Sequence, residues 1–252
     1  IASGGNYNVV VGDEAGTALT TGDFNTSVGY GALSTEDTAS RSTAVGYRAL
    51  LTQNAGDVNA GNTAVGYDAG FSITTGVENT LMGFAAGDAL TDADFNVAVG
   101  RWSLTADTKG NKSVAVGYSS LMNQNFTSST DTYNTAVGFQ AGTSVTTGDT
   151  NTLIGGLSGD ALTTGDANVA VGVHALGGDT QGLHSVAIGY NSLLTQNQTS
   201  AVNTYNVAVG SGAGQLVTTG TNNTLIGGLA GDAITTGAAN VAVGYRSLSA
   251  TT

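Results

Sequence analysis

Residues 134–138 read Asn-Thr-Ala-Val-Gly, and close variants of this pentapeptide recur along the whole chain of 252 residues. The number of its glycine rises in steps of 17, as from Gly138 to Gly155, except for three longer steps of 20, 21 and 21. A fixed period along a whole chain is the signature of a repeat architecture, in which each unit packs mainly against its neighbours. The sequence therefore predicts a single repeat domain over residues 1–252. The glycines are Gly12, Gly29, Gly46, Gly66, Gly83, Gly100, Gly117, Gly138, Gly155, Gly172, Gly189, Gly210, Gly227 and Gly244.

Each repeat has the pattern of a short strand that ends in a tight turn. We number every unit so that the recurring glycine is position 5. Position 2 is always Thr or Val, position 4 is always aliphatic or Met, and position 8 is always Ala or Ser. This alternation before a glycine is typical of a strand, and we expect position 4 to face the core. A unit of this length is too short for a helical hairpin. The sequence predicts an all-β fold, a parallel β-solenoid of 14 coils.

Positions 9 and 12 vary together and supply one large apolar side chain per coil. Where position 9 is Gly, position 12 is usually aliphatic, as in Leu19, Ile73, Leu90, Val145, Leu162, Val217 and Ile234. Where position 9 is Leu, position 12 is polar, as in Glu36, Gln53, Asp107, Gln124, Asp179 and Gln196. Close packing explains this compensation, since one core space is filled from either of two places. The coil types recur as a super-repeat of four coils, and its longer coil carries extra residues within 53–61, 123–133 and 196–205.

Position 3 lies on the opposite side of the strand from positions 2 and 4, and it is also apolar. A strand that is apolar on both faces is covered on both faces. Because a solenoid covers only its inner face, we expect a second chain to cover the outer one, in a homotrimer. The alternative is a wider monomeric coil that tolerates alanine at position 3. The expected trimer interface is Ala64, Leu81, Ala98, Ala115, Ala136, Leu153, Ala170, Ala187, Ala208, Leu225 and Ala242.

Two segments carry a resemblance to known families. Ser185-Val-Ala-Ile-Gly-Tyr-Asn-Ser-Leu193 resembles the head repeats of trimeric autotransporter adhesins of the YadA type. Asn134-Thr-Ala-Val-Gly-Phe-Gln-Ala-Gly142, followed by Thr146-Thr-Gly148, is similar to β-roll repeats of phage tail fibres, which often end in an endosialidase-type chaperone domain. The resemblance implies a left-handed β-roll of three chains that binds host surfaces. The adhesin repeats are shorter than the units of this chain, so the sequence does not choose between the two families.

Composition limits the partners and cofactors. The chain has 18 acidic and 6 basic residues, a net charge of −12, and no cysteine. This charge argues against nucleic acid and against anionic membrane surfaces. No apolar run reaches the ~20 residues of a spanning helix, so we expect no membrane insertion by this segment. We expect no cofactor. Since the chain begins with Ile1, we expect it to be a fragment of a longer fibre protein.

Candidate sites are few, and each has a structural alternative. Asp149 and Asp166 lie one coil apart and are weak candidates for a metal site, with capping of turn amides as the favoured alternative. The exposed aromatics expected at position 6 either bind sugars or cover their neighbours, and we favour the second. The extra residues are polar, and insertions in solenoids are frequently on the binding side. The alternative, which we favour slightly, is that these loops are spacers and that recognition belongs to a domain outside this segment. The candidate surface contacts are Asn123, Asn125, Phe126, Gln196, Asn197 and Gln198.

The function expected from these patterns is structural. No set of residues suggests catalysis, because His174 and His184 have no repeated acidic partner. We expect a non-catalytic segment of an extracellular homotrimeric attachment fibre, from a bacterial adhesin or a phage tail fibre. Its partners would be its own copies and a host-surface glycan or protein. The alternative is a carbohydrate-binding or polysaccharide-processing solenoid, which a groove lined with aromatics and paired acids would favour.

Overall fold

The computed structural model describes residues 5–249, and its regular elements in that range are all strands. The fold is a parallel β-solenoid of about 14 turns with a spacing of about 17 residues, which confirms the predicted all-β solenoid. The chain divides into two compact units, unit 1 ending at Thr132 and unit 2 beginning at Tyr133.

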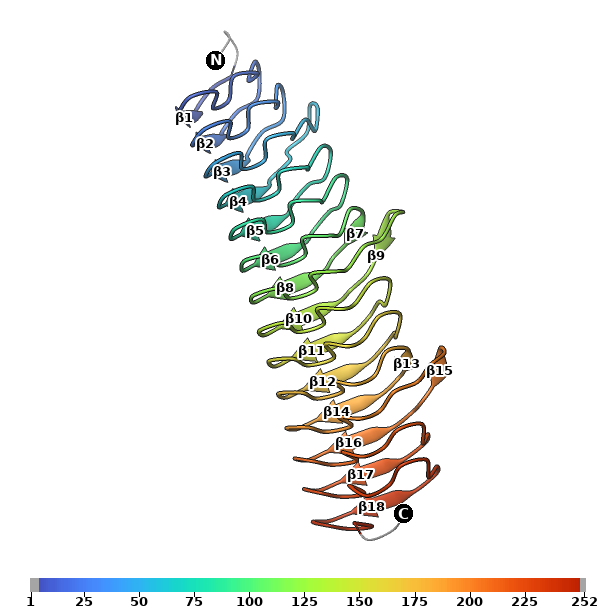
Figure 1. Cartoon of the computed structure of the whole chain (residues 1–252). Helices are drawn as coiled ribbons and strands as arrows, with labels where there is room; N and C mark the ends of the chain where they lie inside the picture. Colours follow the sequence, from blue (N-terminus) through green and yellow to red (C-terminus); the bar gives the residue numbers. More distant parts are fainter. Residues whose placement is uncertain (1–4, 250–252) are drawn as a thin grey trace. The chain divides into compact units, whose positions relative to one another are not determined.

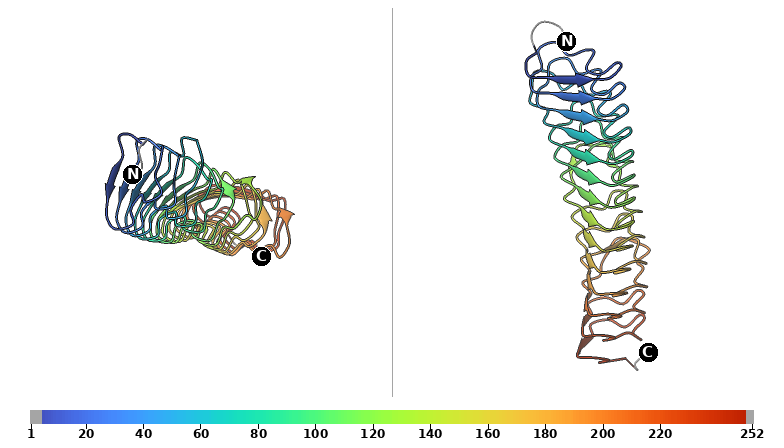
Figure 2. Two further views of the ribbon diagram at one scale, coloured as in Figure 1. Left: turned by 90° about the horizontal axis from the view of Figure 1, so that it is seen from above. Right: turned by 90° about the vertical axis from the view of Figure 1, so that its left-hand side faces the viewer.

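In unit 1 each coil contributes one strand to a parallel main sheet, and neighbouring strands stack side by side (Figures 1 and 2). Pairing keeps the repeat in register even across the longer coil, where Thr43 lies opposite Thr63. The main strands are β1 (Val9–Val11), β2 (Thr26–Val28), β3 (Thr43–Val45), β4 (Thr63–Val65), β5 (Thr80–Met82), β6 (Val97–Val99) and β8 (Val114–Val116). A small side sheet pairs β7 (Gly110–Asn111) with β9 (Thr130–Asp131).

Unit 2 repeats this arrangement. Its side sheet pairs β13 (Gly182–Leu183) with β15 (Val202–Asn203). Register is again kept across the longer coil, where Val186 lies opposite Val207. The main strands are β10 (Thr135–Val137), β11 (Thr152–Ile154), β12 (Val169–Val171), β14 (Val186–Ile188), β16 (Val207–Val209), β17 (Thr224–Ile226) and β18 (Val241–Val243).

The interior of the coil is lined by position 3, so the prediction that position 3 forms an interface is wrong. The eleven residues assigned to that interface are at most 2% exposed within the single chain: Ala64, Leu81, Ala98, Ala115, Ala136, Leu153, Ala170, Ala187, Ala208, Leu225 and Ala242. Position 4, expected in the core, lies on the outside, as at Val137 and Ile154. The reason is space: so short a coil is narrow, and it admits alanines with one larger side chain from positions 9 or 12.

The larger side chain of each coil comes from position 9 or position 12, as the sequence pattern predicted. Leu33 and Leu50 at position 9, and Ile73 and Leu90 at position 12, are all fully buried. In unit 2 the same exchange is made between Val145 and Leu176, both of which are buried. The predicted compensation between positions 9 and 12 is confirmed.

The recurring glycine is required where adjacent coils turn. Gly155 has a φ of +132°, and a Cβ atom built on it would lie 2.6 Å from both the carbonyl carbon and oxygen of Gly172 in the next coil. Both the dihedral angle and the backbone contact exclude a side chain. Stacking of the coils therefore depends on glycine at position 5.

Asparagines at position 1 form a ladder inside the coils. In unit 2 the Oδ1 atom of Asn151 accepts from the backbone N of Asn168 at 3.0 Å, and its Nδ2 donates to the carbonyl of Gly165 at 2.8 Å. The same two bonds recur at Asn79 and Asn168. Each buried amide thus satisfies backbone groups that the turns leave without strand partners.

Candidate functional site

The outer face of the main sheet is open to solvent, with Val, Ile or Met at the end of every main strand and Thr or Val at its start. We define the outer face as the first and last residues of each main strand, from Val9 and Val11 to Val114 and Val116 in unit 1. In unit 2 it runs from Thr135 and Val137 to Val241 and Val243. Met82, Ile154 and Ile226 on this face are 45%, 39% and 40% exposed. Contiguous apolar surfaces larger than roughly a few hundred Å² are uncommon on monomers and mark interaction sites.

A column of stacked aromatic rings borders the outer face in unit 1. The rings of Tyr30, Tyr47, Tyr67 and Phe84 stack with centroid separations of 5.3, 4.9 and 5.0 Å. Each of these side chains is still 40–44% exposed. Because stacking fills the faces of the inner rings, their edges rather than their faces meet solvent. The prediction that these aromatics cover their neighbours is confirmed.

Two arginines lie close to rings of this column and to the neighbouring Trp102 ring. The guanidinium of Arg101 lies 3.9 Å from the centroid of the Trp102 ring and 5.2 Å from that of Phe84. Arg48 lies 5.0 Å from the Tyr47 ring centroid and makes a two-point contact with Asp68, at 2.8 and 2.6 Å. Faces of the Tyr47, Tyr67 and Trp102 rings are thus occupied by other rings or by a guanidinium group and are closed to a sugar ring.

The extra residues form lateral loops, which we define as residues 54–60, 125–132 and 197–204. The second and third loops contain β9 and β15, which lie at the opposite edge of the coils from the main strands (Figure 1). Asn125 and Asn197 in these loops are exposed, as is Asn123 just before the second loop, as expected for surface contacts. Phe126, Gln196 and Gln198 are only 7%, 0% and 6% exposed, so their assignment as surface contacts is wrong.

These side chains are buried because each lateral loop folds over a carboxylate inside the coil. Oδ1 of Asp107 accepts from the backbone N of Gly110 at 3.1 Å and of Phe126 at 3.0 Å, and Oδ2 accepts from Gln124 Nε2 at 2.5 Å. Gln124 Nε2 also donates to Ser113 Oγ at 2.9 Å. The loop is therefore fixed at its base by hydrogen bonds to a fully buried carboxyl group.

The same cluster recurs in the other super-repeats. Asp179 accepts from Gly182 N at 3.1 Å, Gln198 N at 3.1 Å and Gln196 Nε2 at 2.5 Å. Glu36 accepts from Gln53 Nε2 at 3.0 Å and from the backbone N of Ala39 at 2.8 Å. Sequence reasoning treated these residues only as polar members of position 12. An acidic residue followed one coil later by Gln, just before each lateral loop, is the signal that identifies them.

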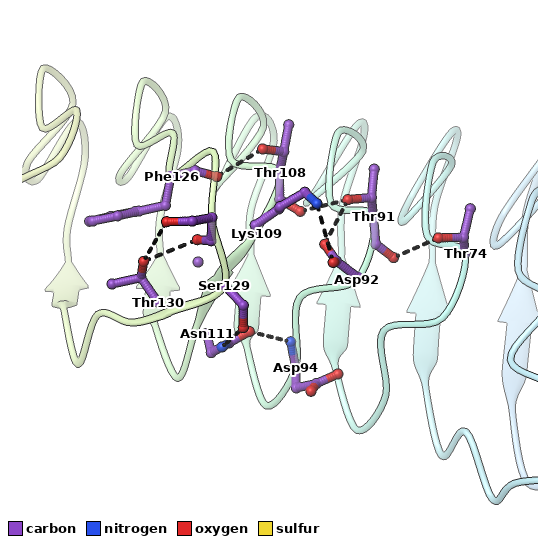
Figure 3. A network of polar contacts seen from close by, with 12 residues as sticks. Thr74, Thr91, Asp92, Asp94, Thr108, Lys109, Asn111, Phe126, Ser129 and Thr130 are labelled. Carbon is purple, nitrogen blue, oxygen red and sulfur yellow. Dashed lines mark hydrogen bonds and ion pairs between the residues drawn. The ribbon is translucent and has the colours of Figure 1, made fainter.

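Threonine hydroxyls beside the second lateral loop are used in holding coils together (Figure 3). Thr74, Thr91 and Thr108 each donate to a backbone carbonyl of the next coil, at 3.2, 3.0 and 2.9 Å. Asn111 Nδ2 donates to Ser129 Oγ at 3.1 Å, and Lys109 pairs with Asp92 at 3.3 Å. This network orders the start of the loop, while Thr127 and Ser128 are exposed.

Asp149 and Asp166 have a structural role. Oδ1 of Asp166 accepts from the backbone N of Asp149 at 2.9 Å, which is the amide capping expected as the alternative to metal binding. Burial raises the pKa of Asp166, and the neighbouring Asp149 carboxylate raises it further. Within residues 5–249 no group of three or more His, Asp or Glu side chains is arranged to hold a metal ion.

The half-buried aspartates at position 10 differ between super-repeats in whether a hydroxyl group donates a hydrogen bond to them. Asp88 accepts a hydrogen bond from the hydroxyl of Thr105, and burial raises its pKa. At the same place in the next super-repeat, the corresponding pair is Asp160 and Gly177. Burial raises the pKa of Asp160, and its Oδ1 atom is buried without a hydrogen-bond partner.

We therefore expect Gly177→Ser to stabilise the protein. The serine hydroxyl would donate to Asp160 as Thr105 does to Asp88, and a hydrogen bond of this kind contributes about 1 kcal/mol. The added Cβ would lie 3.2 Å from Asp160 Oδ1, so the carboxylate has to shift slightly. Thermal unfolding followed by circular dichroism measures the gain. Gly177→Ala adds the Cβ without the hydroxyl, and an equal gain in that control would contradict the hydrogen-bond explanation.

The described range includes no helix of the length and hydropathy needed to cross a membrane. Comparisons of the chain with protein-family models, with curated proteins and with solved structures give no match. A function is therefore inferred from three features: the repeat geometry, the outer face and the lateral loops.

Proposed function

We propose that this chain is a non-catalytic structural and adhesive segment of an extracellular homotrimeric attachment fibre, of a bacterial surface adhesin or a phage tail fibre. Its own copies cover the outer face, and a host-surface glycan or protein is the adhesive partner. The observation that carries the proposal is the outer face, where Val, Ile and Met side chains remain exposed along the main strands of each unit.

A copy of the same chain is the partner that fits this face best. The face repeats with every coil, so a partner that covers it over many coils needs the same spacing. A second copy has that spacing without any further adjustment, and symmetric self-association is the commonest way to cover such a surface. The resemblance to adhesin head repeats, which pack as three chains, supports three copies rather than two.

The alternative is a carbohydrate-binding or polysaccharide-processing solenoid. The exposed aromatic column of unit 1 favours it, because aromatic side chains are common in sugar-binding surfaces. The covered ring faces of Tyr47, Tyr67 and Trp102 weigh against stacking on sugars. A structural fibre is therefore the better-supported function.

The trimer is tested by light scattering coupled to size-exclusion chromatography. We expect three times the chain mass of 24.8 kDa for the unaltered protein. The double substitution Ile154→Glu with Ile226→Glu places charges on the outer face, and we expect a monomer with unchanged strand content, because charges are poorly tolerated in a buried interface. Leu216→Glu is the matched control, since Leu216 is 47% exposed but lies outside the outer face. A monomeric unaltered protein would overturn the proposal.

A further inference from the structure

Two asparagines of the lateral loops stand in the acceptor sequence for N-linked glycosylation. The triplets are Asn125-Phe126-Thr127 and Asn197-Gln198-Thr199, and they occupy the same place in successive super-repeats. Asn followed two residues later by Thr or Ser is the sequence that asparagine glycosyltransferases recognise, and it is used where it lies on an accessible surface. From this placement we propose that Asn125 and Asn197 are sites of N-linked glycan attachment.

The geometry of both asparagines leaves the reacting nitrogen accessible. The Thr108 hydroxyl shares its proton between the Phe126 carbonyl at 2.9 Å and Asn125 Oδ1 at 3.2 Å, and the Thr180 hydroxyl does the same between the Gln198 carbonyl at 2.9 Å and Asn197 Oδ1 at 3.0 Å. Both asparagines are exposed, and so are Thr127 and Thr199, whose hydroxyls the enzyme must contact. Among residues 5–249 no hydrogen bond engages the Nδ2 atom of either asparagine, so the exposed side chain leaves this nitrogen open to an enzyme.

The middle residue of each triplet fixes the loop. The backbone N of Phe126 donates to Asp107 at 3.0 Å, and that of Gln198 donates to Asp179 at 3.1 Å. The acceptor asparagine and the hydroxyl residue therefore flank a fixed point of the backbone. A sugar on Nδ2 would replace no hydrogen bond of the folded coil.

In the other triplets of the same type, the Nδ2 atom of the asparagine donates a hydrogen bond within the protein. Asn25 is buried and its Nδ2 donates to the Ala39 carbonyl at 3.0 Å. Asn111 is 7% exposed and its Nδ2 donates to Ser129. Asn222 is exposed at a coil corner, but its Nδ2 donates to Thr221 Oγ1 at 3.1 Å. The first lateral loop has Asn54 in the corresponding place, followed by Ala55 and Gly56, and so lacks the hydroxyl.

The modification is a glycosyl transfer from a sugar diphosphate donor, linked to a lipid or a nucleotide. The amide Nδ2 forms a bond to C1 of the sugar, and the bond between C1 and the diphosphate oxygen breaks. The diphosphate leaves with the electron pair, and one amide proton passes to a base of the transferase. The lateral loops lie at the far edge of the coil from the main strands, so a glycan there is compatible with the proposed trimer (Figure 1).

The test incubates the purified, folded chain with a nucleotide-sugar-dependent asparagine glycosyltransferase and its donor, and maps the modified residues by peptide mass spectrometry. We expect Asn125 and Asn197 to be occupied, with Asn25, Asn111, Asn222 and Asn54 unmodified. Thermally unfolded chain should additionally be modified at Asn25 and Asn111. Thr127→Val and Thr199→Val should each lower modification of the neighbouring asparagine at least tenfold, without changing the melting temperature.

Two results would overturn the proposal. The first is a folded chain that stays unmodified at Asn125 and Asn197 while the unfolded chain is modified there. The second is equal occupancy of Asn222, because exposure alone would then explain the pattern. Neither result depends on the oligomeric state, so the proposal and the proposed trimer fail separately.

Discussion

Asp179→Ala is expected to lower the free energy of unfolding by about 3 kcal/mol or more, because it leaves three buried donors without an acceptor. Those donors are the backbone N of Gly182 and of Gln198 and the side-chain amide of Gln196. Gln196 is fully buried and Gln198 is 6% exposed, so water does not replace the lost carboxylate at low cost. Urea unfolding followed by far-ultraviolet circular dichroism measures the loss.

Asp160→Ala is the matched control in the same unit. Asp160 is half-buried, and its Oδ1 atom has no hydrogen-bond partner. Removing it should leave the midpoint of unfolding unchanged or slightly raised. If both substitutions lowered stability equally, a general need for acidic side chains would explain the result, and the specific hydrogen bonds of Asp179 would not.

Gly155→Ala is the second substitution with a large expected effect. A Cβ at this residue would lie 2.6 Å from backbone atoms of Gly172, and the φ of +132° is one that residues with side chains rarely adopt. Backbone strain of this kind costs about 1–3 kcal/mol, and the overlap with the next coil adds to it. We expect a loss of at least about 3 kcal/mol, or a failure to fold, as judged by strand content and urea unfolding.

Gly156→Ala tests whether the position or the loss of any glycine matters. A Cβ at Gly156 would meet only the Phe139 carbonyl oxygen, at 4.0 Å, and its φ lies outside the left-handed region. The unfolding midpoint of this variant should stay close to that of the unaltered protein. A similar loss in the two variants would show that the contact with Gly172 is not the cause.

The sequence predicted the coil and its filling, because both follow from spacing. The exchange between Leu33 and Leu19 needed only the period and the idea of constant core volume. The pattern failed to orient the strand, since Ala136 and Val137 are both apolar and hydropathy does not distinguish inside from outside. The width of the coil determines which face of the strand is interior, and this width is known only once the path of the turns is known.

The lateral loops were predicted as insertions, but their anchoring was not. Asp107 and Gln124 are polar, and polar residues are usually at the surface, so their burial contradicts the commonest expectation. What overrides it is the need of turn amides for an acceptor, as at Gly110 and Phe126. Such a need is not visible in a residue pattern until the backbone path is known.

The alternation of coil types also determines which coils can stack on one another during folding. If one coil were left out of the stack, a carboxylate such as Glu36 would lie against a coil that has no Gln at position 12, and the misplaced contact would be weak. A displacement by a whole super-repeat would instead match nearly every buried group, as Asp107 and Gln124 match Asp179 and Gln196. Errors of folding in this chain should therefore be of one kind, the looping out of four coils at a time, and cooperative closure of neighbouring coils is what prevents them.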